Sequence, residues 1–139
     1  MYYKDKEVYT SSRGGKDYDT PTTYIRKNTF LNQFFSNNPN VILDGELYIH
    51  GKPLSYISGI VRLQDLCEKH KELQYYVYDI VDETKTFQER LKILTELDKC
   101  MSLSSIIPNK VVVVNHENVS GKDAIIQLHN QYVSEGYEG

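Results

Sequence analysis

The sequence has few cysteines and no long apolar run. Its 139 residues include two cysteines, Cys67 and Cys100, which lie far apart and form no Cys-x-x-Cys pair. This pattern favours reduced thiols in a cytoplasm over a disulfide or zinc framework. No run of about 18 or more apolar residues could span a bilayer, and the opening Met-Tyr-Tyr-Lys-Asp-Lys lacks the apolar core of a signal peptide. We therefore expect a cytoplasmic protein with no membrane partner.

Several site patterns are also missing. The four histidines show no metal-ligand spacing, and the pair Cys67 and His70 has no second pair to complete a zinc site. No Gly-x-Ser-x-Gly elbow indicates a hydrolase. Ser120-Gly121-Lys122 lacks the upstream glycine of a P-loop, so helix capping explains it better. The net charge of -3 and the pI near 5.8 do not give the basic footprint that is usual for nucleic-acid-binding domains.

The length fits one domain with one core over residues 1–139, without a repeat, linker or low-complexity segment. Strand formers predict a hairpin over residues 1–11 that turns at Asp5-Lys6, and strands over 41–49, 74–81 and 111–114, the last buried on both faces. Helices are predicted from Thr20-Pro21 to Asn37-Asn38-Pro39, in parts of 55–71, after the capping box Thr86-Phe87-Gln88-Glu89, and after a Ser120 cap. This irregular alternation favours an α+β fold, with mainly antiparallel sheets flanked by helices, over a doubly wound parallel sheet.

One predicted strand places a carboxylate beside a glycine. In Leu43-Asp44-Gly45-Glu46-Leu47-Tyr48, the glycine would leave room for a ligand next to Glu46. Three further motifs frame this stretch in a fixed order: Ser12-Arg13-Gly14-Gly15-Lys16, Tyr76-Val77-Tyr78-Asp79-Ile80 and Glu135-Gly136-Tyr137-Glu138-Gly139. Together they resemble the ATP-dependent DNA ligases, specifically the middle of their adenylation (nucleotidyltransferase) domain. The resemblance covers nearly the whole chain and implies an ATP-grasp-like nucleotidyltransferase fold, here a single partial domain truncated at both ends.

The resemblance assigns the ATP-binding residues. Glu46 matches a glutamate that accepts a hydrogen bond from a ribose hydroxyl, and Tyr78 matches an aromatic residue, most often phenylalanine, that stacks on adenine. Each residue also has a simpler interpretation. Glu46 could be an exposed strand glutamate that faces solvent, and Tyr78 could be one face of a core, because tyrosines alternate with Val77 in that strand.

The resemblance also assigns residues to phosphate and metal. Arg13 matches an arginine that contacts phosphate, including the 5′-phosphate at a nick in DNA, and a guanidinium suits this role because its planar fork binds phosphate in a bidentate way. As a short loop motif it is otherwise an ordinary loop cation. Glu138 matches a glutamate that helps to place the catalytic metal, and Glu135 competes for that register because it too precedes a glycine.

No catalytic lysine is assigned. The family's Lys-x-Asp-Gly motif supplies the lysine that attacks ATP, but Ile42 stands two residues before Asp44-Gly45, and no Lys-x-Lys motif follows Glu138. We expect the chain alone to be inactive. The complete enzyme is expected to use ATP and Mg²⁺ to seal nicked duplex DNA through lysyl-AMP and DNA-adenylate intermediates, in replication, repair or recombination. Three alternatives stay open: a non-catalytic nucleotide- or DNA-end-binding module, a related RNA ligase or capping-type nucleotidyltransferase, and a purely structural α+β domain.

Overall fold

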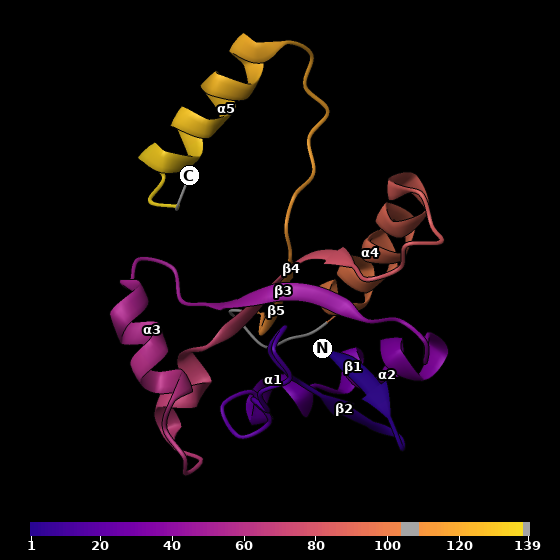
Figure 1. The fold of residues 1–139 in the computed structure, drawn as a ribbon, viewed down its shortest axis with the longest axis vertical. Coiled ribbons are helices and arrows are strands. Elements are labelled where there is room, and N and C mark those ends of the chain that lie inside the picture. Colours follow the sequence, from indigo (N-terminus) through magenta and orange to yellow (C-terminus); the bar gives the residue numbers. More distant parts are fainter. Residues whose placement is uncertain (104–108, 138–139) are drawn as a thin grey trace.

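The computed structural model describes residues 1–103 and 109–137, and within them the strands form two small sheets (Figure 1). Strands β1 (Tyr2–Lys4) and β2 (Glu7–Tyr9) make the predicted hairpin. Its turn residues Asp5 and Lys6 have φ values of 51° and 66°, the left-handed conformation that the tightest hairpin turns require. The hairpin is joined to the second sheet where the amide of Leu43 donates to the carbonyl oxygen of Met1, at 2.8 Å.

The second sheet is three-stranded and mixed. Its strands are β3 (Leu43–Tyr48), β4 (Gln74–Ile80) and β5 (Val111–Val113), in the order β3-β4-β5. The pair β3 and β4 is antiparallel, whereas β5 runs parallel to β4. The α+β class expected from the sequence is therefore confirmed, with one parallel pair added to antiparallel ones.

Helices surround this sheet. They are α1 (Thr23–Arg26), α2 (Thr29–Asn37), α3 (Leu54–Val61), the 3-10 helix η1 (Glu68–Glu72), α4 (Phe87–Ser102) and α5 (Lys122–Ser134). The capping box predicted for α4 is confirmed: the Glu89 carboxylate accepts from the Thr86 amide at 2.8 Å, and the Thr86 hydroxyl accepts from the Glu89 amide. These bonds satisfy amide groups that would otherwise have no helical partner.

The helix predicted to begin at Thr20-Pro21 is instead two helices. Asn28 has an extended ψ of 125°, and its side chain accepts from the amide of Leu31 at 3.0 Å, so it caps α2. The Asn32 side chain donates to the carbonyl of Arg26 at 2.6 Å and thereby holds the break. The apolar spacing continues through this break, which is why periodicity alone predicted one helix.

Two further predictions are wrong in detail. Ser120 does not cap α5: the N-cap is Gly121, with φ of 87° and no side-chain capping bond. Within β5, Val111 is buried, but Val112 and Val113 are only partly buried. The reason is that both residues line an open cavity rather than a second layer of core.

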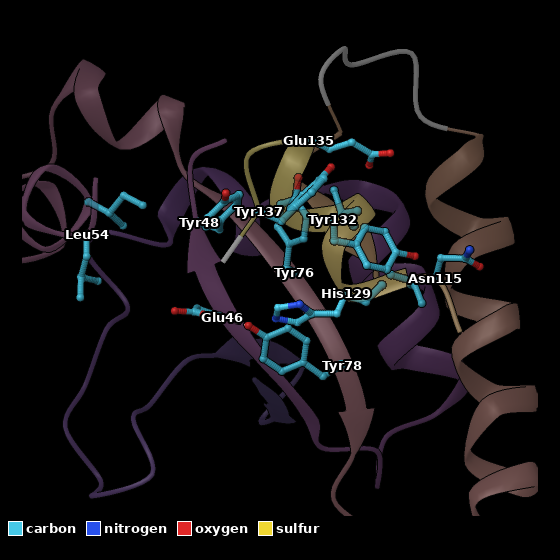
Figure 2. A pocket seen from close by; sticks show the side chains of 14 residues that line it. Glu46, Tyr48, Leu54, Tyr76, Tyr78, Asn115, His129, Tyr132, Glu135 and Tyr137 are labelled. Carbon is cyan, nitrogen blue, oxygen red and sulfur yellow. Dashed lines mark hydrogen bonds between the residues drawn. The ribbon is translucent and has the colours of Figure 1, made fainter. Parts of the chain in front are cut away.

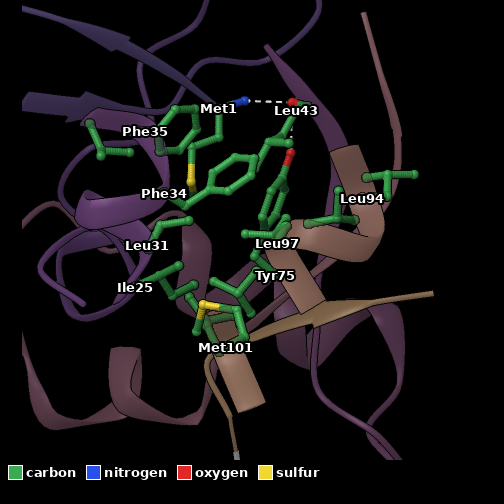
Figure 3. Close-up of a cluster of buried hydrophobic side chains, with 14 of the residues drawn as sticks. Met1, Ile25, Leu31, Phe34, Phe35, Leu43, Tyr75, Leu94, Leu97 and Met101 are labelled. Atoms are coloured by element: carbon green, nitrogen blue, oxygen red, sulfur yellow. Dashed lines mark hydrogen bonds between the residues drawn. The ribbon is translucent and has the colours of Figure 1, made fainter. Parts of the chain in front are cut away.

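The core lies on one side of the second sheet (Figure 3). Its largest fully buried side chains come from α1, α2, β3, β4, β5 and α4 and include Ile25, Leu31, Phe34, Phe35, Leu43, Val77, Leu94, Leu97, Met101 and Val111. Tyr75 crosses this core, and its hydroxyl donates to the carbonyl of Leu43 at 2.9 Å, while burial raises the pKa of its phenol. Figure 1 shows α5 on the opposite side of the sheet, at the end of an extended segment. None of the described helices is long and apolar enough to cross a membrane.

Candidate functional site

A cavity of about 480 Å³ lies on the sheet face that points away from the core (Figure 2). Alternate residues of β3 and β4 form its floor, because successive side chains of a strand point to opposite faces. These floor residues are Glu46, Tyr48, Tyr76 and Tyr78, and β5 adds Val112 to Val114. The other walls come from α3, through Leu54 and Ile57, and from α5 and the residues after it, through His129, Tyr132, Glu135 and Tyr137. The volume falls in the range of small-molecule sites.

Glu46 and Tyr78, predicted from the sequence as one site, do meet in this cavity. The Tyr78 hydroxyl donates a hydrogen bond to Glu46 Oε2, and Figure 2 shows the two side chains directed toward each other. The Tyr78 ring is 42% exposed, so it is not part of the core. The simpler interpretation of Tyr78 as a core tyrosine is therefore wrong.

A β-bulge lies at Tyr78. Asp44 pairs with Asp79, but Gly45 pairs with Val77, so Tyr78 is the additional residue on β4. Tyr78 shares the face of Tyr76, two residues before it, and the additional residue changes the alternation after it, so that Ile80, three residues after Val77, is again buried in the core.

The sequence predicted that Gly45 would leave room for a ligand, and this prediction is wrong. A Cβ atom at this position would lie 2.2 Å from the carbonyl oxygen of Tyr76 and 2.9 Å from Cζ of Tyr75. The glycine is required by close packing inside the sheet, against the neighbouring strand and the Tyr75 ring. The ligand space near Glu46 comes from the opposite face instead.

Four tyrosine side chains close one end of the cavity, and the ring of His50 packs against them. The rings of Tyr48 and Tyr76 meet edge to face, with centroids 5.1 Å apart, and Tyr137 stacks against Tyr48 at 6.5 Å. His50 lies 4.8 Å from Tyr137, and Tyr132 meets Tyr137 edge to face at 6.0 Å. Burial, and then the nearby phenols of Tyr137 and Tyr48, raise the pKa of Tyr76. These contacts are the means by which the end of α5 is held over the sheet.

Arg13 lies outside this cavity. It sits in a tight loop in which the Ser12 amide donates to the Lys16 carbonyl at 2.7 Å, and Gly15 takes a φ of 81°. The Arg13 side chain is 94% exposed, and its Nη2 atom lies 3.8 Å from Oδ2 of Asp44. Because Asp44 is two residues before Glu46 on β3, the loop places an accessible guanidinium near the cavity but not in it.

The metal assignment cannot be placed. Glu138 lies outside the described residues, whereas its competitor Glu135 lines the cavity and accepts from the Gln131 side chain at 2.9 Å. Within residues 1–103 and 109–137, no group of three or more His, Cys, Asp and Glu side chains could hold a metal ion. The described lining of the cavity also contains no lysine or arginine. As described, the cavity can therefore hold an uncharged aromatic and hydroxylated group better than a phosphate.

Sequence reasoning missed most of the lining. Tyr48 and Tyr76 lie two residues from Glu46 and Tyr78 on their strands, so the two-residue period could have placed them on the same face. His129 and Tyr132 share one face of α5, and Glu135, the C-cap of the helix, follows at the same spacing of three residues. No local signal could have shown that this helix face meets this sheet face.

Comparisons with known proteins show the family of this chain. Residues 1–139 match the family described as ATP dependent DNA ligase domain. A DNA ligase of African swine fever virus, isolate Tick/Malawi/Lil 20-1/1983, is 33% identical over 102 residues, which cover 71% of this chain and 23% of the viral protein. The ligase of isolate Pig/Kenya/KEN-50/1950 is 32% identical over the same length. The chain thus spans about a quarter of the length of these relatives.

A solved structure extends the likeness to the fold. It comes from a structure-function analysis of Lig E DNA ligases, described as DNA binding with a minimal scaffold. The TM-score is 0.66 over 95% of this chain and 46% of the other, with 23% sequence identity. At this identity, the match supports the shared fold.

Proposed function

This chain belongs to the ATP-dependent DNA ligase domain family, and on that premise we propose that it forms the adenosine-binding middle of the adenylation domain of a nick-sealing enzyme. One observation carries the proposal: the carboxylate of Glu46 and the ring of Tyr78 meet in a single cavity on one face of the sheet. The carboxylate would accept a hydrogen bond from a ribose hydroxyl. The aromatic ring would stack on adenine, a contact that is worth about 1–3 kcal/mol per base.

The chemistry of the complete enzyme needs groups beyond this cavity. In the proposed reaction, AMP is transferred from ATP to a lysine and then to the 5′-phosphate at a nick in duplex DNA, and a 3′-hydroxyl displaces it. These 139 residues do not supply the lysine in a Lys-x-Asp-Gly pattern. Arg13 would contact the 5′-phosphate from its exposed loop. Mg²⁺ would lower the cost of charge on the phosphates, and Glu138 is its proposed ligand. Roles in replication, repair or recombination, and a cytoplasmic site of action, are part of the same proposal.

Adenosine binding is the direct test. Calorimetric titration of the chain with adenosine should give weak, saturable binding, because the cavity lining described above offers no cation for phosphates. Glu46→Gln should weaken adenosine binding, but it should leave binding of 2′,3′-dideoxyadenosine unchanged, because the dideoxy compound lacks the 2′- and 3′-hydroxyls that the carboxylate would bind. Glu96→Gln, an exposed glutamate on α4 outside the cavity, serves as the control. Equal loss for both nucleosides would show that Glu46 does not hold the ribose.

A second experiment tests whether the chain alone can form a covalent adduct with AMP. Incubation with ATP labelled at the α-phosphate, followed by denaturing gel electrophoresis, should leave the 139-residue chain unlabelled. A labelled protein band would show that a lysine among these residues can act as the nucleophile, contrary to the proposal.

A non-catalytic nucleotide-binding module is the second candidate. It is favoured by the described cavity lining, which contains no lysine or arginine. A longer protein that carries both lysine motifs would distinguish the two: sealing of nicked duplex DNA supports a ligase, and nucleotide binding without sealing supports the module. Preference for nicked RNA, or transfer to an RNA 5′ end, would indicate the RNA ligase or capping alternative.

A further inference from the structure

The bulge at Tyr78 is held in place at the next residue, Asp79, by a side chain from outside the cavity. Arg90 on α4 forms a bidentate ion pair with Asp79, in which Nε donates to Oδ1 at 2.8 Å and Nη2 donates to Oδ2 at 2.9 Å. The third guanidinium nitrogen, Nη1, donates to the carbonyl of Lys85 at 2.8 Å, so the guanidinium is itself held in place. These two side chains are only 20% and 34% exposed, which limits screening of the pair by water. Hydrogen bonds from Arg90 keep the pKa of Asp79 below its usual value, so the carboxylate stays charged at neutral pH.

A second hydrogen bond holds the main-chain carbonyl group of Tyr78 itself. The Nε2 atom of His116, in the segment after β5, donates to the carbonyl oxygen of Tyr78 at 3.2 Å. The ring of Phe87 packs against both His116 and Arg90: its centroid lies 5.6 Å from that of the His116 ring and 5.8 Å from the guanidinium carbon of Arg90. The bulge is therefore held at two consecutive residues by side chains from two different segments.

We infer that Arg90, acting through Asp79, and His116 are positioning residues that hold the main chain of the bulge at Tyr78 and Asp79 and thereby fix the position of the Tyr78 ring and hydroxyl relative to Glu46. Neither Arg90 nor Asp79 lines the cavity, so neither would touch a ligand there. A bulge locally disrupts the strand ladder, so these contacts restrain the main chain at Tyr78 and Asp79 where regular strand pairing does so less well. The inference rests on the proposed function only where adenosine is used as the probe.

The ligand-free test reads the direction of Tyr78 by NMR. In protein labelled with ¹³C-tyrosine, the Tyr78 ring signal is assigned by its loss in Tyr78→Phe. Glu46→Gln should shift this signal in the wild-type protein. The same Glu46→Gln change should shift it by less than half as much in Arg90→Lys, because an ammonium cannot reproduce the bidentate contact to Asp79. Lys85→Ala, which removes the neighbouring, partly buried ion pair with Asp82, should leave the full shift.

The second readout is adenosine affinity. Arg90→Lys and Asp79→Asn should each weaken binding about three- to tenfold, the range expected for loss of one hydrogen-bonded positioning contact. In a Tyr78→Ala background the same changes should have no further effect, because the residue they position is gone. A purely structural role would lower the melting temperature and would act equally in both backgrounds.

Each outcome decides the inference. If Arg90→Lys and Asp79→Asn lower stability but leave both the Glu46-dependent shift of Tyr78 and the adenosine affinity unchanged, the positioning role is wrong. If the wild-type protein binds no adenosine, the proposed function fails, and the NMR shift alone still decides whether Arg90 positions Tyr78. If Arg90→Lys does not fold, Asp79→Asn and His116→Ala test the same contacts with smaller changes.

Discussion

Replacing Gly45 by alanine tests the packing that holds the cavity floor together. The added Cβ would lie 2.2 Å from the carbonyl oxygen of Tyr76, and it would also meet two ring atoms of Tyr75 at 2.9 and 3.0 Å. The nearest of these atoms belongs to the backbone of a paired strand, so it cannot turn away as a flexible side chain could. Strand β3 would have to move away from β4 by about 1 Å to bring this contact to the 3.0 Å below which real Cβ atoms are essentially never found.

The magnitude follows from that displacement. Overpacking in a well-packed core costs about 1–3 kcal/mol and occasionally more. Separation of the strands adds the weakening of ladder hydrogen bonds, each worth about 0.5–1.5 kcal/mol. The Tyr75 ring, whose hydroxyl donates to Leu43, would move with them. We therefore expect Gly45→Ala to lower the free energy of unfolding by about 3–5 kcal/mol, a large share of the ~5–15 kcal/mol typical of a domain.

Urea unfolding followed by circular dichroism measures this loss, and the chain offers a matched control. Gly59 lies in α3, and a Cβ there would meet nothing within 4 Å. Gly59→Ala should therefore raise stability by about 0.5–1 kcal/mol, because alanine favours a helix over glycine. If Gly45→Ala costs less than 1 kcal/mol, or if both substitutions act alike, the close approach of β3 to β4 described here is wrong.

Four further changes test separate parts of the protein. Tyr78→Phe keeps the ring and should change adenosine affinity less than about fivefold, whereas Tyr78→Ala should cost about tenfold or more by titration calorimetry; equal losses would argue against stacking. In a longer enzyme that carries both lysine motifs, Arg13→Ala should slow single-turnover sealing of pre-adenylylated nicks about tenfold or more, and Arg13→Lys should restore the rate in part. Unchanged rates would show that Arg13 is an ordinary loop cation. Burial lowers the pKa of the Met1 amine from 8.0 to about 6. In a chain with a free amine, the free energy of unfolding should therefore be highest above pH 8 and should fall by about 1–3 kcal/mol as the pH drops toward 6. Acetylation of the amine should remove this pH dependence, and its persistence would locate the effect elsewhere. Asn28→Ala should cost about 1 kcal/mol in urea unfolding, because α2 loses its cap, and no loss would mean that the break between α1 and α2 does not depend on this side chain.

The sequence by itself determined those features that depend on neighbours along the chain. The capping box at Thr86, the hairpin turn at Asp5-Lys6 and the strand character of β3 and β4 follow from local hydrogen bonds and side-chain shape, so they could be predicted. The order of the four motifs likewise pointed to the ligase family, which the match over residues 1–139 confirms. The pairing of Glu46 with Tyr78 in one cavity was expected from that order and is found in the structure.

Only the tertiary structure decided how these local pieces meet. The bulge at Tyr78 depends on the register between two strands separated in sequence, and the role of Gly45 depends on the Tyr75 ring and the backbone of the neighbouring strand. The aromatic wall needs Tyr137 to come back to Tyr48, a contact between residues far apart in the chain. Such contacts form only when many side chains pack at once, and no short stretch of sequence contains both partners. The sequence could therefore name Glu46 and Tyr78, but the packing of distant segments determined the direction in which they point and the walls that enclose them.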